Sequence, residues 1–154
     1  MRSAFSSRPV ILSLLHSLLA EEYALYLATR DASHAAVGCW RLVLEGQTRG
    51  IGTHLERLAW QLGCRGECAL VGRTLPGNES PRSPVATLTG LRHLRRLHDG
   101  LIGQLHRFGA RTSRLGDPAL DELFGDLLSG HAQAASTLRS HASDSADASR
   151  PAAA

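Results

Sequence analysis

The chain has 154 residues, of which 43% are hydrophobic and 20% are charged, and its formal net charge is +3 at pH 7. This length allows one well-buried core and is too short for two ordinary domains. Aromatic residues make up only 5%, so the core must consist mainly of aliphatic side chains, which favours packed helices and nearly excludes an all-β enzyme. All seventeen basic residues are arginines, so only their placement can carry functional meaning.

The N-terminal region does not have the pattern of a targeting signal. Residues 10–19 are apolar but are interrupted by Ser13, His16 and Ser17. No stretch approaches the roughly 18 uninterrupted apolar residues of a membrane span. We therefore expect a cytoplasmic protein without a membrane segment.

The three cysteines are an odd number in a chain of this size, which argues against a secreted disulfide framework. Cys64 and Cys68 form a pair with three residues between them in an expected loop. This pair is open to a metal or redox role, although two free thiols are the simpler interpretation.

Caps and glycines divide the chain into four predicted helices. Ser7 and Pro9 supply a cap and an early-turn proline for the first, and Gly38, Gly63 and Gly116 end the first three. The predicted helices cover about residues 9–37, 40–62, 85–115 and 118–142.

The connections between these helices predict the fold. Asp117 and Pro118 allow a short link into the fourth helix, whereas residues 63–84 collect Gly, Pro, Asn and Ser and form the only long connection. A short, long, short order matches a ferritin-like antiparallel four-helix bundle with one long crossover between its second and third helices. We expect a flexible arm over residues 1–8, the bundle over 9–142 and a disordered tail over 143–154.

Three glycines make the second predicted helix the weak point of this fold. Gly46, Gly50 and Gly52 each cost roughly 1 kcal/mol relative to alanine in a helix interior. Either another backbone packs closely against them, or this helix is frayed or kinked.

Two stretches resemble the Dps proteins, which are small dodecameric relatives of ferritin that oxidise and store iron and protect DNA in stressed bacteria. Residues 15–30 look like the first Dps helix, and residues 97–141 follow its third and fourth helices in order, caps and loop length. The resemblance implies iron as the metal, ferroxidase activity, and a homo-oligomer, by analogy a dodecamer.

The ligands of the iron site that Dps proteins build between subunits are only partly retained. Ser33 stands where the first histidine belongs, Arg49 takes a ligand position, and Trp60 replaces a carboxylate. An arginine opposes a dication directly, so we expect a degraded ferroxidase centre. The remaining candidate ligands are His34, Glu45 and Glu56.

A second constellation comes from the helix faces themselves. Glu22, His98 and His131 each lie in or beside the apolar stripe of a different predicted helix, near its middle. In an antiparallel bundle these side chains can meet at one level of the core. They would form either a metal site inside one subunit or a buried carboxylate that is hydrogen-bonded to imidazoles.

Arginines gather on the third predicted helix, on the face opposite its leucines. They either contact phosphates or form a solvated face that pairs with the acidic fourth helix. No sequence-specific DNA-binding motif is present, so any DNA contact would be nonspecific. The candidate nucleic-acid contacts are Arg2, Arg8, Arg92, Arg95 and Arg96.

Two functions follow from these observations. The first is a Dps-like protein that binds and stores iron and protects DNA and the cell under oxidative or starvation stress. The alternative is a non-catalytic bundle oligomer that acts as a structural or nonspecific DNA-binding assembly, associated with the nucleoid.

Overall fold

The computed structural model describes residues 4–68 and 88–147, which contain four long helices and no strand. A short 3-10 turn, η1 (Ser113–Leu115), follows the third helix. The helices are α1 (Ala4–Ala35), α2 (Cys39–Cys64), α3 (Leu88–Thr112) and α4 (Pro118–Asp147).

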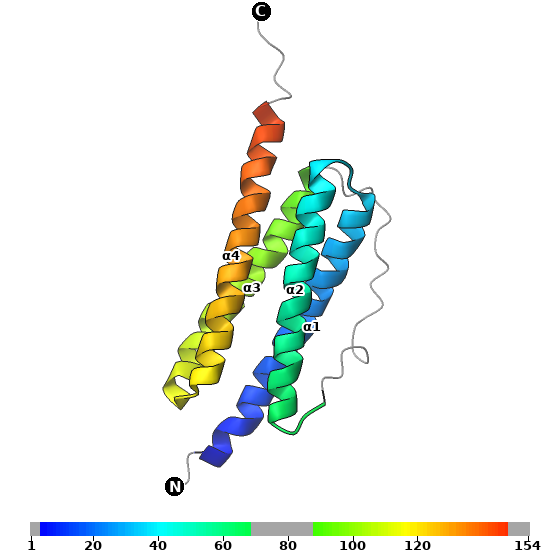
Figure 1. The fold of residues 1–154 in the computed structure, drawn as a ribbon. Helices are drawn as coiled ribbons and strands as arrows, with labels where there is room; N and C mark the ends of the chain where they lie inside the picture. Colours follow the sequence, from blue (N-terminus) through cyan, green and yellow to red (C-terminus); the bar gives the residue numbers. More distant parts are fainter. Residues whose placement is uncertain (1–3, 69–87, 148–154) are drawn as a thin grey trace, which may run out of the picture.

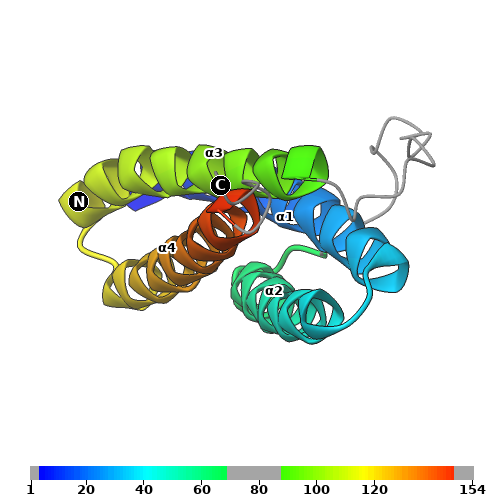
Figure 2. The same ribbon diagram turned by 90° about the horizontal axis from the view of Figure 1, so that it is seen from above.

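The helices form two antiparallel hairpins, α1 with α2 and α3 with α4 (Figure 1). Seen from above, α1 and α3 form one layer and α2 and α4 the other (Figure 2). Helices α2 and α3 run in the same direction (Figure 1), so they do not form an antiparallel hairpin; the predicted long connection between them lies mostly outside the described residues. The predicted ferritin-like four-helix bundle is confirmed.

Leucine dominates the core, as the low aromatic content predicts. Burying one such side chain contributes about 1.5–3 kcal/mol relative to leaving it in water. The fully buried leucines, which come from all four helices, are Leu15, Leu18, Leu25, Leu44, Leu58, Leu62, Leu94, Leu105, Leu120, Leu123, Leu127 and Leu138.

The helix that supplies the first of these leucines is also the most apolar. By length and composition alone α1 could cross a membrane, with a mean hydropathy of 1.4 in its best window. Several of its apolar side chains belong to the common core, and 39% of that window is buried in the bundle.

Two predicted boundaries are wrong. Helix α1 begins at Ala4, so residues 4–8 are helical and not a flexible arm; Pro9 therefore lies inside the helix, where its missing N–H removes one backbone hydrogen bond. Helix α4 continues to Asp147 beyond its predicted end, because neither glycine nor proline interrupts the chain there until Pro151.

Other predicted boundaries are confirmed. Gly38 and Gly116 adopt positive φ angles of 63° and 66° directly before α2 and after η1, a conformation that glycine adopts without strain. The Asp117 carboxylate accepts a hydrogen bond from the backbone N–H of Leu120 at 3.2 Å and so caps α4.

The glycines of α2 do not interrupt the helix, and no other backbone of the same chain packs against them. Helix α2 is continuous from Cys39 to Cys64. A Cβ atom added at Gly46 or Gly50 would meet nothing within 4 Å, and one added at Gly52 would reach only ordinary contact with Tyr26. Neither fraying nor close packing within the chain therefore explains Gly46 and Gly50, which border open space in the single chain.

Candidate metal centre

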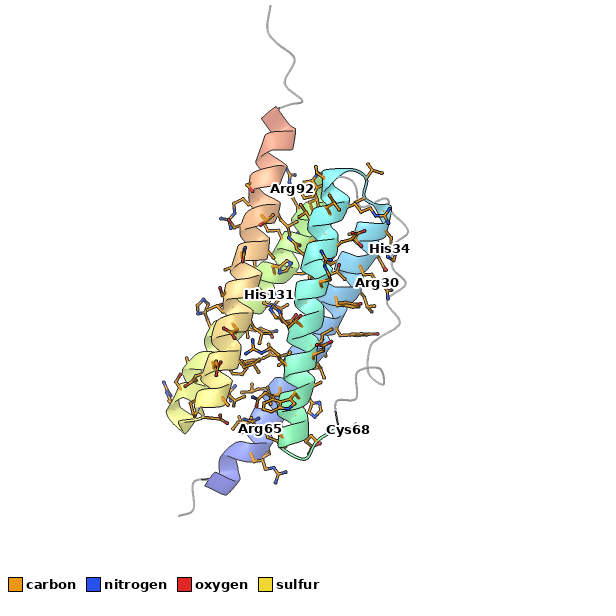
Figure 3. The ribbon with its side chains drawn as sticks, viewed as in Figure 1. Arg30, His34, Arg65, Cys68, Arg92 and His131 are labelled. Carbon is orange, nitrogen blue, oxygen red and sulfur yellow. The ribbon has the colours of Figure 1, made fainter. Side chains whose placement is uncertain are left out.

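A buried carboxylate in the middle of the bundle contacts a histidine from the diagonally opposite helix. Glu22 of α1 has no exposed surface, and its Oε1 lies 2.6 Å from Nε2 of His131 on α4. His131, only 1% exposed, lies at mid-height of the bundle between α4 and α2 (Figure 3). The predicted meeting of these two side chains is confirmed.

His98 of α3 completes the predicted trio. Its Nδ1 lies 3.0 Å from Nδ1 of His131, so a single hydrogen joins the two rings. His131 presents Nε2 to the carboxylate and must donate from it. With both rings neutral, His131 therefore accepts at Nδ1, His98 donates from Nδ1, and His98 keeps a lone pair on Nε2.

A fourth member, His54 of α2, was not predicted. Its Nδ1 lies 3.5 Å from the same oxygen of Glu22, and its ring packs edge-on against His131 with the centroids 5.1 Å apart. His54 stands three residues after Ile51 and four before Leu58, both buried. His54 therefore lies on the inner face of α2, and the same helical periodicity that marks Glu22, His98 and His131 also marks this position.

A glycine makes room for His54. A Cβ atom added at Gly130 of α4 would lie 2.8 Å from both Cε1 and Nε2 of the His54 ring, closer than non-bonded atoms tolerate. Gly130 also directly precedes His131. The absence of a side chain at this position therefore lets two imidazoles from facing helices occupy the same level of the core.

The surroundings of Glu22 and His98 set their protonation states. Burial raises the pKa of the Glu22 carboxyl, but the hydrogen bond from His131 and the approach of His54 outweigh it and hold this pKa below its ordinary value. Burial, with repulsion from His131, lowers the pKa of His98 to about 4. At neutral pH the cluster thus holds an ionised carboxylate beside a neutral His98.

The donor atoms of this cluster suit a transition metal ion. One ligand atom each from Glu22, His54 and His131 lies within 4.8 Å of the others, and two imidazoles with one carboxylate are a set that binds Fe²⁺ or Zn²⁺. Within the cluster, three buried atoms have no hydrogen-bond partner: Glu22 Oε2, His54 Nδ1 and His98 Nε2. Each unsatisfied group lowers the free energy of unfolding by about 1–3 kcal/mol. The cluster therefore contains more polar atoms than hydrogen bonds within the core can satisfy.

The interface ligands predicted from the Dps resemblance lie apart from this cluster. His34 is exposed near the end of α1 (Figure 3). Glu45 and Glu56 lie on α2 about three turns apart, too far for one ion within a chain. Glu45 accepts a hydrogen bond from Arg41 at 2.8 Å, whereas Glu56 is exposed beside a separate pocket that also contains Trp60.

Ser33, which stands at the first Dps ligand position, is buried. Its hydroxyl donates to the backbone carbonyl of Arg30 at 2.7 Å. The neighbouring Thr29 satisfies its hydroxyl in the same way, through the carbonyl of Leu25 at 2.8 Å. Thr29 and Ser33 continue the polar face of α1 beyond Glu22, but their hydroxyls donate to backbone carbonyls of the same helix.

The predicted nucleic-acid contacts divide into two groups. Arg92 and Arg96 are exposed on α3, and Arg95 lies 3.5 Å from Asp99 on the same helix. Arg8 instead donates to the carbonyl of Arg65 beyond α2, and Arg2 lies outside the described residues. The arginine face predicted for α3 is thus partly solvated.

Two acids that lie in or directly before α4 pair with arginines that lie in or directly after α2. Asp126 pairs with Arg57 at 2.7 Å, and Asp117 pairs with Arg65 at 2.6 Å. None of the described ion pairs joins α3 to α4. These pairs therefore do not support the expected pairing of the α3 arginines with the acidic helix of their own chain.

Cys64 and Cys68 are exposed and unbonded, as is Cys39. Neither belongs to the Glu22 cluster. The simpler interpretation of the cysteine pair, two free thiols, agrees with this geometry.

The helix order and the parallel directions of α2 and α3 define the class: a ferritin-like four-helix bundle. The chain is similar to Dps from Thermosynechococcus elongatus, with a TM-score of 0.76 and 14% identity over 88% of this chain and 92% of that one. It is also similar to ferritin-like, diiron-carboxylate proteins from Bacillus anthracis, with a TM-score of 0.72 and 15% identity over 88% of this chain and 97% of that one. No protein-family model and no curated protein matches the sequence. At these identities the Dps resemblance is confirmed for the fold.

Proposed function

We propose that this chain binds iron as cargo, through Glu22, His54 and His131 inside each bundle, and stores it in a ferritin-like homo-oligomer. The observation that carries this proposal is the buried, ionised carboxylate between two imidazoles from different helices, with donor atoms left unpartnered around it. A carboxylate this deep in a protein is stable only if it is paired, hydrogen-bonded or bound to a metal. Iron with N and O ligands suits this environment.

The broader role follows the Dps resemblance. We propose a cytoplasmic assembly, dodecameric by analogy, that removes ferrous iron and so protects DNA and the cell under oxidative or starvation stress. Three exposed thiols suit a reducing compartment. Ferroxidase activity at the interface position is expected to be slow or absent, because Arg49 stands among its candidate ligands.

Anaerobic titration with ferrous ion tests the metal site. We expect one tightly bound ion per chain, lost in His54→Ala and in His131→Ala and retained in the control His34→Ala, which removes an exposed imidazole. Light scattering on the same preparation gives the mass of the assembly, and admission of air gives the rate of iron oxidation. A wild-type protein that binds no ion, or one whose ion is lost only in His34→Ala, would contradict the proposed site.

The exposed arginines of α3 support a second candidate function, nonspecific binding to nucleic-acid phosphates. We expect affinity for a short duplex of arbitrary sequence to fall steeply with salt, and the salt slope to decrease in a variant that carries Arg92→Gln and Arg96→Gln. Binding that is insensitive to salt would rule this function out.

A further inference from the structure

A pocket of about 430 Å³ opens between α2 and α4 and leads to the cluster. The exposed side chains of Leu42 and Gln133 lie at its outer part, and the buried rings of His98 and His131 lie at its inner end. Burial therefore increases along the pocket from the surface of one subunit to the imidazoles.

Glycines keep this pocket open. Gly46 and Gly50 follow one another by one turn of α2, line the pocket, and leave open space where a Cβ atom would point. Each costs the helix roughly 1 kcal/mol relative to alanine. No close packing within the chain requires either glycine, so their structural consequence is the empty space itself.

Unpartnered acceptors occur at two depths of the pocket. Gln47 donates its amide N–H to the carbonyl of Ala134 at 3.4 Å, and its Oε1 has no partner. Deeper, the fully buried His98 leaves Nε2 without a partner. Lone pairs on oxygen and nitrogen are what a cation binds.

The pocket also differs in charge from the rest of this basic chain. Its lining contains neither arginine nor an acidic residue, although the chain has seventeen arginines. Its volume exceeds the roughly 180 Å³ needed for six waters at about 30 Å³ each, the hydration shell of an octahedral divalent ion. A hydrated dication can therefore enter without close approach to a guanidinium.

From these features we propose that the pocket between α2 and α4 is the access route by which a divalent transition-metal cation reaches Glu22 within one subunit, with Gln47 and His98 as transit ligands. The inference rests on the proposed metal site. It adds that loading occurs through the bundle wall of a single chain and needs no contribution from a second copy.

The test follows the loading of cobaltous ion, whose visible absorption changes when nitrogen ligands replace water. Gly50→Leu fills the pocket, and Gly125→Leu is the matched control, because Gly125 lies on α4 outside the pocket and also has open space at its Cβ. We expect Gly50→Leu to load roughly tenfold or more slowly than the wild type, because loading then waits for local opening of the bundle. The final stoichiometry and spectrum should be unchanged, and Gly125→Leu should load at the wild-type rate.

Gln47→Leu separates ligation from blockage, because it removes the amide oxygen and adds little volume. It should also slow loading without changing the end point. If Gly50→Leu takes up no cobalt in its folded form, refolding in the presence of cobalt decides: a loaded product supports the access route. If refolded Gly50→Leu still binds no cobalt, the added side chain disturbs the metal site itself. Gly46→Leu, whose substitution lies two turns from His54, then replaces Gly50→Leu in the rate comparison.

Equal loading rates in the wild type and in a pocket-filled variant that binds cobalt would overturn the access route and leave the proposed metal site intact. A wild-type chain that binds no cobalt at any time would overturn the site and the route together. Slow loading in Gly125→Leu as well as in Gly50→Leu would show a general effect of helix substitution and would also overturn the route.

Discussion

The outer face of α2 and the centre of the bundle each present a carboxylate that was a candidate metal ligand. The side chains that contact these two carboxylates differ. On the outer face Glu45 pairs with an arginine. In the core Glu22 pairs with imidazoles and retains an unpartnered oxygen. An arginine satisfies a carboxylate and repels a cation, whereas an imidazole can exchange its proton for a metal. The identity of the neighbouring base, more than the carboxylate itself, therefore separates a surface ion pair from a potential metal site.

The largest difference between the two regions should appear on removal of one negative charge from each. Glu22→Gln should lower metal affinity by more than about 100-fold, because even changes to outer partners of a metal ligand cost about 10- to 100-fold. Glu56→Gln, at an exposed carboxylate, should leave affinity unchanged. Isothermal titration with ferrous or cobaltous ion measures both.

The same pair of variants also tests the purely structural interpretation of the cluster. Without metal, Glu22→Gln should remain folded and lose about 1–3 kcal/mol of unfolding free energy, because the amide changes the donors that face His131. Equal metal content in the wild type and Glu22→Gln would leave only a hydrogen-bonded core cluster.

Acidification of the metal-free protein should also act through the core. The pKa of His98 falls from 6.5 to about 4 on folding, so the unfolded chain binds more protons than the native one between these values, and stability decreases as pH falls through this window. The loss approaches about 3 kcal/mol at its lower end. The lowered pKa of Glu22 adds a loss of the same sign below its unfolded value.

Urea unfolding at a series of pH values measures this dependence. His98→Gln should flatten it between pH 6.5 and 4, and His106→Gln, which removes an exposed imidazole from the same helix, should not. A wild-type stability that stays constant across this window would contradict the assignment of a neutral, buried His98.

Gly130 offers a smaller and more local perturbation. Gly130→Ala should displace the His54 ring from Glu22, because the new Cβ would lie 2.8 Å from it. We expect metal affinity to fall roughly tenfold, as for loss of a supporting contact. The control Gly125→Ala should gain up to about 1 kcal/mol in stability from helix propensity and keep its affinity. Tight metal binding by Gly130→Ala would show that His54 is not a ligand.

The fold and three of the four cluster residues, Glu22, His98 and His131, could be predicted because both depend on local patterns. Leucine periodicity, the glycines at 38 and 116 and the Asp117 cap specify helices and their ends, and Glu22 and His131 interrupt apolar stripes that must face inward. The start of α1 could not be predicted, because Pro9 favours a first turn, whereas the contact of Arg8 with the carbonyl of Arg65 directly after α2 depends on the tertiary fold.

The rest of the site depends on relations between helices. The helical wheel places His54 on the inner face of α2, but its contact with Glu22 depends on how close α2 lies to α4. That spacing depends on the missing side chain of Gly130, a residue from the other hairpin. The empty space beside Gly46 and Gly50 likewise depends on the distance between α2 and α4. Glycine in a helix predicts either close packing or a gap, and the sequence of one helix does not distinguish these outcomes.

The smallest expected effect concerns the ion pair on the outer face. Arg41→Ala should cost at most about 0.5 kcal/mol, because Arg41 and Glu45 are one helical turn apart and largely solvent-exposed, and such pairs contribute little. Freeing Glu45 should not create a metal site within one chain, since Glu56 lies about three turns away along α2. Titration should therefore give the same stoichiometry as for the wild type. A second ion bound by Arg41→Ala, and lost again on adding His34→Ala, would show that association of two copies assembles the interface ligands, and the contrast between the two regions would then hold only for the isolated chain.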